Sequence, residues 1–314
     1  MKAAVVTDFN QAPMYQEATL PLVQSNEVVV DVLAASVNRV VMAKANGTHY
    51  SSEGQLPLIP GVDGVGKTAD GQLVYFVGSK PRFGTLAEQV VTDAHYVMPL
   101  PANATPSVVA ATVNPAMSSY MAIMARLGQE QVQGKKVLVL GATGNAGRLA
   151  ITISKLLGAS TTIAVGRNAE ELRVSEADLT LNLTDTDFEA QLGQVSDVDV
   201  VLDYLWGDVT ARVMSALLKQ CQNHHQLLNW VEIGSLAGSS FAFPAAALRS
   251  TALSLIGSGQ GSFSAHDLVT YLPKLLTLIS DGTLQVPVTA YPLSTVHENW
   301  PTETTNRIVF VTGD

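Results

Sequence analysis

The sequence predicts an α/β protein in two parts, a β-rich domain and a domain built on a doubly wound parallel sheet. Three observations carry this prediction. The chain has 314 residues, which exceeds the usual size of one hydrophobic core. Short strand-like runs separated by Gly and Pro fill roughly the first hundred residues. From about residue 105, buried strand patterns alternate with helical patterns, as in a parallel sheet covered by helices.

Composition narrows the classes of protein that are possible. The hydrophobic fraction of 47% and the charged fraction of 14% are typical of a well-buried globular protein. The net charge of -9 disfavours nucleic acid or an anionic membrane as a partner, because both attract basic surfaces. Asp8 lies too early for a signal peptide, and no apolar run approaches the roughly 20 residues of a membrane span. We therefore expect a cytoplasmic protein.

The first hundred residues are expected to form a compact β domain, a barrel or a sandwich. Glycine and proline residues separate the apolar runs and supply the turns. The expected strands are residues 2–7, 27–34, 73–77 and 87–91.

The middle of the chain has the alternating pattern of a doubly wound sheet, with ligand groups expected at the carboxyl ends of its strands. The expected strands are residues 136–140, 160–165, 179–183, 198–202, 227–233 and 251–256. The expected helices are residues 106–124, 149–157, 169–177 and 208–219. Beyond residue 262, a helix over 265–280 and strands over 286–291 and 308–311 fit either domain.

The strongest motif is the G-x-x-G-x-x-G loop between the strand at 136–140 and the helix that follows it. Its glycines permit a tight turn, a close approach of backbone to pyrophosphate, and close packing of helix on strand. Free N–H groups at the start of the helix then bind phosphate. The sequence predicts a dinucleotide site that includes Gly141, Thr143, Gly144, Asn145, Ala146 and Gly147. The alternative is an ordinary turn between strand and helix.

The residues after the next strand favour NADPH over NADH. NAD enzymes place an acid there to bind the ribose hydroxyls, whereas this chain has Gly166, Arg167 and Asn168. A guanidinium binds a 2′-phosphate that a carboxylate would repel. The alternative is that Arg167 is a solvated residue at the start of a helix.

Two other chemistries are disfavoured. Residues 61–68 match the phosphate-loop pattern G-x-x-x-x-G-K-[ST], but prolines precede them and a strand follows, so no phosphate-binding helix starts there. The six histidines are scattered and Cys221 is the single cysteine, which predicts no metal site and excludes an internal disulfide. No G-x-S-x-G elbow of an α/β-hydrolase is present.

In this order the segments resemble the medium-chain dehydrogenase/reductase superfamily, and most of all its zinc-independent quinone oxidoreductase-like branch. The resemblance spans essentially the whole chain and rests on residues 35–38 (ASVN), 59–66 (IPGVDGVG), 141–147, 200–203 (VVLD), 233–235 (IGS), 291–294 (YPLS) and 306–310 (NRIVF). It implies a GroES-like β-rich catalytic domain formed by residues 1–112 and 263–314, around a Rossmann NADPH-binding domain over 113–262.

Departures from the zinc-dependent members are informative. Those enzymes carry Cys where this chain has Asn38, and His-Glu where it has Val62-Asp63. A Lewis-acid mechanism is therefore disfavoured. The zinc-free relatives reduce quinones or enones with hydride from NADPH, and pair as homodimers through the last Rossmann strand, which is residues 253–256 here.

The resemblance also implies catalytic and cofactor-binding residues. Asn38 matches the asparagine near the nicotinamide, and His49 or Tyr50 matches a hydrogen-bond donor to the reduced oxygen. The alternative is that His49 and Tyr50 only line a pocket. The further cofactor residues are expected to be Asn114 (alternatively a helix N-cap), Tyr204 beside the nicotinamide, and Gly234, Ser235, Gly257 and Ser258, whose backbones would hold the carboxamide.

Three functions remain open at this point. The first is reduction of a quinone or enone by NADPH. The second is NADPH binding without turnover, in a sensory role. The third is oxidation of secondary alcohols by NADP without zinc.

Overall fold

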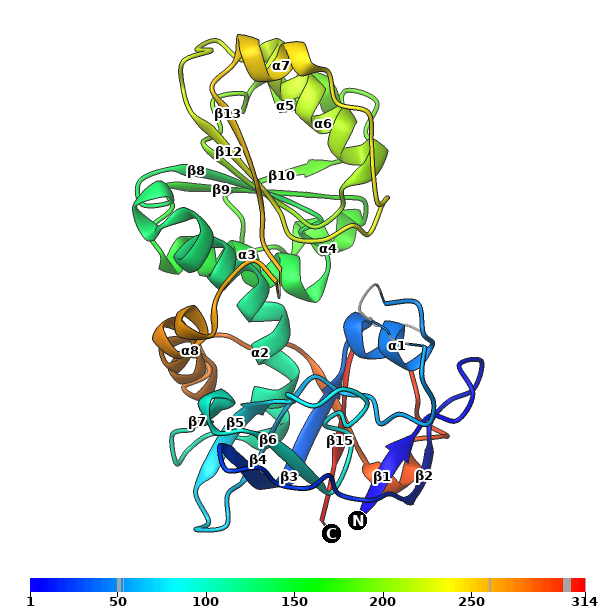
Figure 1. The fold of residues 1–314 in the computed structure, drawn as a ribbon. Helices are drawn as coiled ribbons and strands as arrows, with labels where there is room; N and C mark the ends of the chain where they lie inside the picture. Colours follow the sequence, from blue (N-terminus) through cyan, green and yellow to red (C-terminus); the bar gives the residue numbers. More distant parts are fainter. Residues whose placement is uncertain (50–51, 53, 260, 302–305, 314) are drawn as a thin grey trace. The chain divides into compact units, whose positions relative to one another are not determined.

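The computed structural model describes residues 1–49, 52, 54–259, 261–301 and 306–313, and the chain divides into two compact units (Figure 1). Unit 1 comprises Met1–Asn114 and Leu268–Asp314, and unit 2 comprises Pro115–Asp267. Unit 1 therefore contains segments from both ends of the chain, whereas unit 2 is one continuous segment.

Unit 1 is organised around a seven-stranded sheet (Figure 1). The strand order is β14-β15-β3-β4-β5-β7, and β6 pairs with β3. The strands are β3 (Glu27–Val37), β4 (Asp63–Lys67), β5 (Leu73–Val77), β6 (Gln89–Asp93), β7 (Val97–Pro99), β14 (Val288–Pro292) and β15 (Arg307–Val311). β14 and β15 run parallel, and the other pairs are antiparallel. β1 (Lys2–Val5) and β2 (Met14–Glu17) form a separate antiparallel pair.

A bulge in β3 decides which of its side chains face the apolar core. The register with β4 shifts between Val32 and Ala34. Since side chains alternate along a strand, the extra residue lets both Val32 and Val37 pack into one apolar cluster, which also contains Phe76 and Phe310. Ser36 and the following Asn38 then face the opposite side of the sheet, a placement that the candidate site depends on.

Three helices complete the described part of this fold, α1 (Arg39–Ala45), α2 (Pro106–Met121) and α8 (Ala265–Ser280). α8 has the bounds expected from its apolar spacing, and buries Leu272, Leu275, Leu276 and Ile279. α2 continues as a wider helical turn over Ala122–Leu127.

The combined helix Pro106–Leu127 bears on the expectation that no apolar run is long enough to span a membrane. Among the described residues it alone is long and apolar enough to span a membrane, and 67% of its most apolar window is buried. No uninterrupted apolar run exists there because Thr112, Asn114 and the serines at 118 and 119 divide it, yet the average remains apolar. Burial inside the protein accounts for that apolar character, since Val109 and Val113 are fully buried.

Unit 2 contains a six-stranded sheet in which every pair of neighbours is parallel. The order is β10-β9-β8-β11-β12-β13, which is the doubly wound dinucleotide-binding order and confirms the predicted fold class. The strands are β8 (Lys136–Leu140), β9 (Thr161–Gly166), β10 (Leu179–Asn182), β11 (Val200–Asp203), β12 (Leu228–Glu232) and β13 (Leu253–Gly257). The helices are α3 (Asn145–Leu156), α4 (Ala169–Arg173), α5 (Phe188–Gly193), α6 (Gly207–Gln220) and α7 (Ala245–Ser250).

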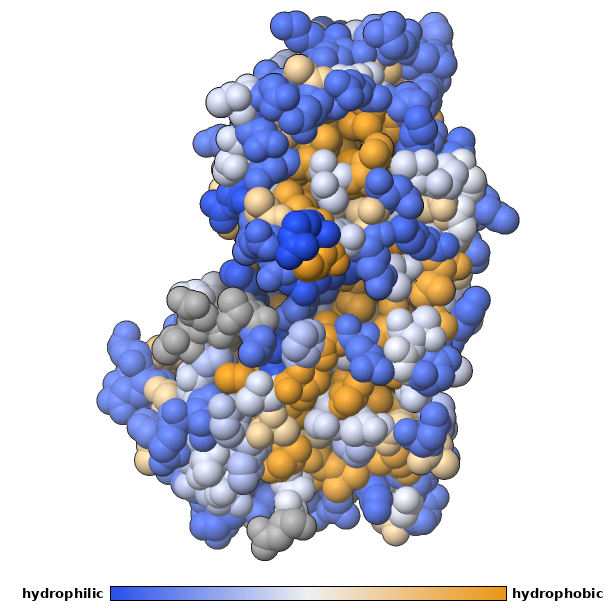
Figure 2. Space-filling model, turned by 180° about the vertical axis from the view of Figure 1, so that it is seen from behind, coloured by the Kyte–Doolittle hydropathy of each residue, from blue (hydrophilic) through white to orange (hydrophobic). Residues whose placement is uncertain are grey.

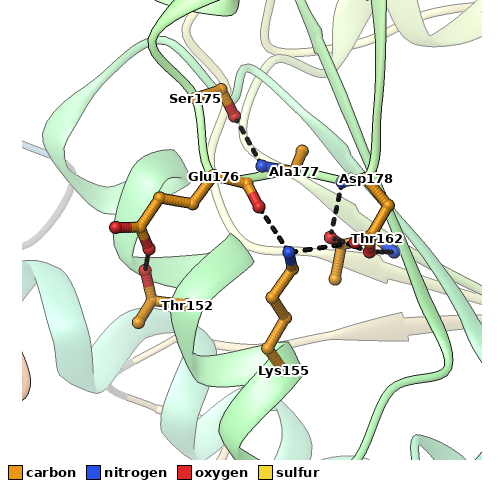
Figure 3. A network of polar contacts seen from close by, with 7 residues as sticks. All are labelled: Thr152, Lys155, Thr162, Ser175, Glu176, Ala177 and Asp178. Atoms are coloured by element: carbon orange, nitrogen blue, oxygen red, sulfur yellow. Dashed lines mark hydrogen bonds and ion pairs between the residues drawn. The ribbon is translucent and has the colours of Figure 1, made fainter.

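A polar network holds the segment between α4 and β10 (Figure 3). The Asp178 carboxylate accepts hydrogen bonds from the Thr162 backbone N–H at 2.7 Å and from its hydroxyl at 2.8 Å. Lys155 Nζ from α3 lies 3.0 Å from the same carboxylate. Ser175 Oγ accepts the Ala177 N–H at 3.2 Å. This side-chain bond takes the place of the backbone hydrogen bond that the Ala177 N–H would donate in a continuing helix. This explains why α4 ends at Arg173 and not at residue 177 as expected.

Within the motif at residues 61–68, Asp63–Lys67 form strand β4, which was not among the expected strands. Gly64 and Gly66 lie against β3, where a Cβ would stand 3.0 Å from the Ala34 carbonyl oxygen and 2.4 Å from the Asp31 carbonyl oxygen. The glycines therefore allow close strand pairing. No helix starts at this motif, as expected, because β4 leads directly toward β5.

Candidate cofactor-binding and catalytic residues

The loop between β8 and α3 has the geometry of a phosphate cradle. Gly141 has φ 96°, a conformation that side chains disfavour. A Cβ on Gly147 would stand 2.3 Å from the Gly141 carbonyl oxygen, so only glycine fits there. A Cβ on Gly144 would meet nothing within 4 Å, so this part of the loop borders open space. The first and third glycines thus serve the fold, and the second leaves room for a ligand.

The start of α3 carries no side-chain cap. Gly144 is the N-cap residue and offers no side-chain acceptor to the first-turn N–H groups, which belong to Asn145, Ala146 and Gly147. A 12-residue helix with this start suits an anion, since its dipole adds to the N–H donors. The residues present therefore fit a pyrophosphate.

The end of β9 lies beside the loop. A Cβ on Gly166 would stand 2.5 Å from Thr143 Cγ2, so the Thr143 side chain packs closely against the Gly166 backbone. Arg167 follows Gly166, is exposed, and forms no hydrogen bond or ion pair with the residues that the structure describes. The structure thus brings Thr143, Gly166 and Arg167 together at one end of the sheet.

The residues after Arg167 are already engaged with one another. Asn168 Oδ1 accepts the N–H groups of Glu170 at 3.1 Å and Glu171 at 3.3 Å, and so caps α4. Glu170 pairs with Arg173 at 3.0 Å, and Glu171 pairs with Arg148 of α3. The nearby acids are therefore neutralised by other arginines and leave the charge of Arg167 uncompensated. Asn168 remains a predicted cofactor residue, with its side-chain oxygen bound to α4.

The carboxyl ends of β8, β11 and β12 meet at the same edge of the sheet. A Cβ on Gly141 would stand 3.2 Å from Tyr204 Cβ, and one on Gly234 would stand 3.3 Å from the Tyr204 carbonyl oxygen. The Tyr204 hydroxyl is 2.9 Å from Ser118 Oγ, and burial raises the pKa of Tyr204 to about 12. Tyr204 is thus a neutral phenol, buried and bonded to Ser118.

The last two strands of unit 2 end beside this edge. Glu232 of β12 is paired with Gly257 of β13. The Gly257 carbonyl accepts Arg126 Nε at 2.9 Å, and the Ser258 N–H donates to the Glu232 carbonyl at 2.8 Å. Ser235 is exposed and follows the half-buried Gly234. The Gly257 carbonyl and the Ser258 N–H are therefore already hydrogen-bonded within the protein.

Sequence reasoning missed the buried carboxylate that shapes this edge. Asp203 Oδ1 accepts the N–H groups of Leu205 at 2.8 Å and Trp206 at 3.1 Å, and Oδ2 accepts the Thr210 hydroxyl at 2.6 Å and Trp230 Nε1 at 2.9 Å. These bonds hold Trp206 at φ 55°. Glu232 was also missed, and burial, with the nearby Asp203 charge, raises its pKa.

In unit 1, Asn38 presents an unpaired amide donor. Its Oδ1 accepts the Val41 N–H at 3.0 Å and caps α1, which fixes the orientation of the amide. Its Nδ2 is buried and has no acceptor among the described residues. A buried donor without a partner costs about 1–3 kcal/mol, so such a group indicates a functional position.

Of the other two predicted catalytic residues, His49 is among the residues that the structure describes. His49 is half-buried, and burial, followed by the Lys44 charge, lowers its pKa, so its imidazole is neutral near pH 7. Tyr50 lies outside the described residues. Asn114 lies inside α2, so the alternative that it caps the start of a helix is wrong.

Val62 and Asp63 occupy the positions where the zinc-dependent enzymes carry His-Glu. Asp63 Oδ2 accepts the Tyr75 hydroxyl at 2.9 Å, and burial raises the pKa of Asp63 to about 6. No group of three His, Cys, Asp or Glu side chains placed to hold a metal ion occurs within the described ranges. An acid within the glycine-rich β4 segment was the signal that sequence reasoning did not use.

Comparisons with known proteins follow the same lines. No family model matches the chain. The probable NADPH-dependent quinone reductase tdiC of Emericella nidulans is 31% identical over 361 aligned positions, which cover 99% of this chain and 100% of that protein. The mitochondrial NAD(P)H oxidoreductase RTN4IP1 of Mus musculus is 29% identical over 65% of this chain and 58% of its own length.

A solved structure shows the same fold. The quinone oxidoreductase of Thermus thermophilus, also solved in complex with NADPH, superposes with a TM-score of 0.79 at 22% identity. The superposition covers 99% of this chain and 100% of that one.

Proposed function

Because the chain belongs to the medium-chain dehydrogenase/reductase superfamily, we propose that it is an NADPH-dependent oxidoreductase that reduces a quinone or another activated double bond. The observation that carries the proposal is the cradle at Gly141–Gly147 with an uncompensated Arg167 beside it. The similarity to tdiC along the whole chain supports the same activity.

The cofactor would be held by unit 2. The start of α3 and the loop at Gly144 would bind the pyrophosphate, and Arg167 the 2′-phosphate. Backbone groups at Gly234, Ser235 and Ser258, with Tyr204 beside them, would line the nicotinamide end. When bound, the cofactor supplies a hydride to an electron-poor carbon of the acceptor.

Asn38 is the residue of unit 1 that we propose to contact the acceptor. Its free Nδ2–H would donate to the acceptor oxygen, where negative charge develops after hydride arrives. His49 in its neutral form also has a ring N–H to donate, and Tyr50 remains a second candidate. Asn114 remains a proposed cofactor contact.

We propose that the reaction needs no zinc because of the donor set. Asn38 offers an amide and Val62 an alkyl group, in place of the thiolate and imidazole that bind zinc well. The remaining acid, Asp63, is bonded to Tyr75.

The proposed partners are a small-molecule acceptor and a second copy of the chain, in the cytoplasm, without nucleic acid or membrane. The net charge of -9 supports the absence of nucleic acid and of anionic membrane. The dimer would pair β13, the edge strand of the unit 2 sheet, with its counterpart. Figure 2 shows apolar residues at the surface between hydrophilic ones.

The test is an absorbance assay of NADPH oxidation with a panel of ortho- and para-quinones and enones, repeated with NADH. We expect turnover with at least one quinone and a preference for NADPH. Turnover of secondary alcohols with NADP instead, insensitive to chelators, would identify an alcohol dehydrogenase. Tight NADPH binding without any turnover would identify a sensor.

A further inference from the structure

One face of the unit 1 sheet carries an unusual set of buried polar atoms without partners. Within the described residues they are Ser36 Oγ, Asn38 Nδ2, Asp63 Oδ1 and Arg307 Nε. All four side chains belong to residues that are less than a tenth exposed. Natural proteins seldom leave such atoms unsatisfied, so their concentration in one place requires an explanation.

The strand register places these residues side by side. Ala34 pairs with Val65 in antiparallel strands, and Ser36 and Asp63 are the residues two positions further along each strand. Val37 pairs with Ile308, and the next position on each strand is Asn38 and Arg307. The Cβ atoms of residues opposite one another on a sheet stand about 4.5–5.5 Å apart. We call Ser36, Asn38, Asp63 and Arg307 the polar face, which lies opposite the apolar cluster of Val37 and Phe310.

The polar face has a matched set of donors and acceptors. Asn38 Nδ2 and Arg307 Nε only donate, and an ionised Asp63 only accepts. The Ser36 hydroxyl does both, and on β3 it stands opposite Asp63 and two residues before Asn38. Its Oγ is not hydrogen-bonded to either residue in this structure, so a proton transfer through Ser36 requires these contacts to close when an acceptor binds, as catalytic hydrogen bonds often do.

The charges around Asp63 keep both of its protonation states accessible. Burial raises its pKa to about 6, while the Tyr75 hydrogen bond and the Arg307 charge lower it. Burial lowers the pKa of Arg307, the Asp63 charge raises it, and the charge of Arg39 of α1 lowers it further. A carboxyl that titrates near the working pH is suited to give and regain a proton.

We propose that Asp63 stores the proton that completes the reduction, and delivers it through the Ser36 hydroxyl to an acceptor bound at Asn38. This rests on the proposed function. After hydride has reached the acceptor, its oxygen carries a negative charge. The O–H bond of Asp63 breaks as Ser36 takes that proton, and Ser36 gives its own proton to the acceptor oxygen. Asp63 is left as a carboxylate near Arg307 and regains a proton from water before the next turnover.

The main test is the pH dependence of kcat in the wild type and two variants. For the wild type, kcat should fall as the pH rises through about 6, because the neutral Asp63 is the acid. Asp63→Asn should lower kcat about tenfold or more and abolish that limb, with the affinity for NADPH unchanged. Tyr75→Phe should move the limb to higher pH, because it removes a bond that lowers the pKa of Asp63.

Two further variants separate the storage of the proton by Asp63 from its transfer through Ser36. Ser36→Ala should lower kcat as Asp63→Asn does, while the Asp63 carboxyl still titrates. Asp31→Asn is the matched control, since Asp31 is an exposed carboxyl on the same strand, bonded to Gln89 at 2.8 Å. Its profile should equal that of the wild type.

A second readout needs neither cofactor nor acceptor. Infrared difference spectra of the wild type should show a carboxyl C=O band that titrates near pH 6 and is missing in Asp63→Asn. If the wild type reduces quinones and Asp63→Asn keeps its kcat and pH limb, the proton store is overturned and the proposed function stands. If no acceptor is reduced, both fail. Should Asp63→Asn not fold, an unshifted limb in Tyr75→Phe overturns the proton store.

Discussion

At the scale of single residues, Asp63 carries a stability cost that depends on pH. Its folded pKa of about 6 lies above the ordinary value of 3.8, so the folded state binds its proton more tightly than the unfolded state. The tighter binding of this proton stabilises the folded state fully at low pH, and this stabilisation is lost as the pH rises through about 6. A shift of about two pKa units corresponds to about 3 kcal/mol of unfolding free energy.

Asp63→Asn is therefore expected to stabilise unit 1 at pH 8 relative to the wild type, by up to about 3 kcal/mol, and much less at pH 4. The amide keeps an acceptor for Tyr75 and removes the buried charge. Denaturant unfolding of both proteins at the two pH values measures the difference. Equal stability at pH 8 would contradict the prediction.

Arg167 is the residue on which cofactor preference should depend. Its guanidinium is exposed and unpaired within the described residues, while the acids of α4 are paired with other arginines. Arg167→Gln should weaken NADPH binding about 10- to 100-fold, the effect of losing one or two charge-assisted hydrogen bonds, and leave NADH binding nearly unchanged. Titration of each nucleotide by fluorescence measures both affinities.

The control for that experiment is Arg173→Gln, which removes a cation from the same segment that is already paired with Glu170. It should change neither affinity by more than about twofold. A parallel loss of NADH and NADPH affinity in Arg167→Gln would point to damage of the fold and not to phosphate recognition.

Residue chemistry was predictable where it depends on sequence neighbours. The glycine roles and the position of Arg167 follow from one strand-loop-helix-strand unit, which can be read along the chain. The contacts of Asn168, Tyr204 and Asp63 were not foreseen. Asp63 faces Ser36 and Tyr75 through the pairing of separate strands, and no local pattern shows that register.

At the scale of elements, the network around Asp178 joins α3 to two strands of unit 2 (Figure 3). The Thr162 hydrogen bonds, with the charge of Lys155, lower the pKa of Asp178 against the effect of burial. A lowered folded pKa means that this stabilisation is present at neutral pH and is lost on acidification. The segment after α4, and with it the start of β10, depends on this carboxylate.

Asp178→Ala should lower the unfolding free energy by about 1–2 kcal/mol at pH 7, a value reduced because the side chain is partly exposed. Glu170→Gln, which removes an exposed ion pair from α4, should cost less than about 0.5 kcal/mol. Thermal or denaturant unfolding compares them. Costs of equal size in the two variants would show that the network adds nothing beyond a surface ion pair.

Long periodic elements were predictable, and short ones were not. α8 and β8 have the expected bounds because their apolar spacing is unbroken. The short helices α1 and α7 were missed, as were α5 and the strands β2 and β7, since elements of about three to seven residues carry little periodicity. β4 was missed because its glycines are typical of turns, whereas here they permit close approach to β3.

At the scale of the whole molecule, the two edges of the unit 2 sheet differ in their proposed use. β13 and β10 lie at opposite ends of the strand order, and each exposes one leucine, Leu255 at 41% and Leu179 at 45%. The proposed dimer buries the β13 edge only. The two leucines therefore form a matched pair for a test.

Leu255→Arg should give a monomer of 33.2 kDa where the wild type has twice that mass, because it places a charge in the proposed interface. Leu179→Arg should remain a dimer. Light scattering after size-exclusion chromatography measures both masses. A monomeric wild type, or two variants of equal mass, would contradict the dimer through β13.

The order of the strands in unit 1 also has a consequence for synthesis of the protein. All six strands of the unit 2 sheet precede residue 258, so this sheet has its full set of strands before β15 is synthesised. Residues 34–37 of β3 pair with β15, which begins only at Arg307. Until the ribosome has released residues 307–311, this half of β3 presents unpaired N–H and C=O groups. The nascent chain is thus most prone to aggregate through β3 after unit 2 has folded and before β15 emerges.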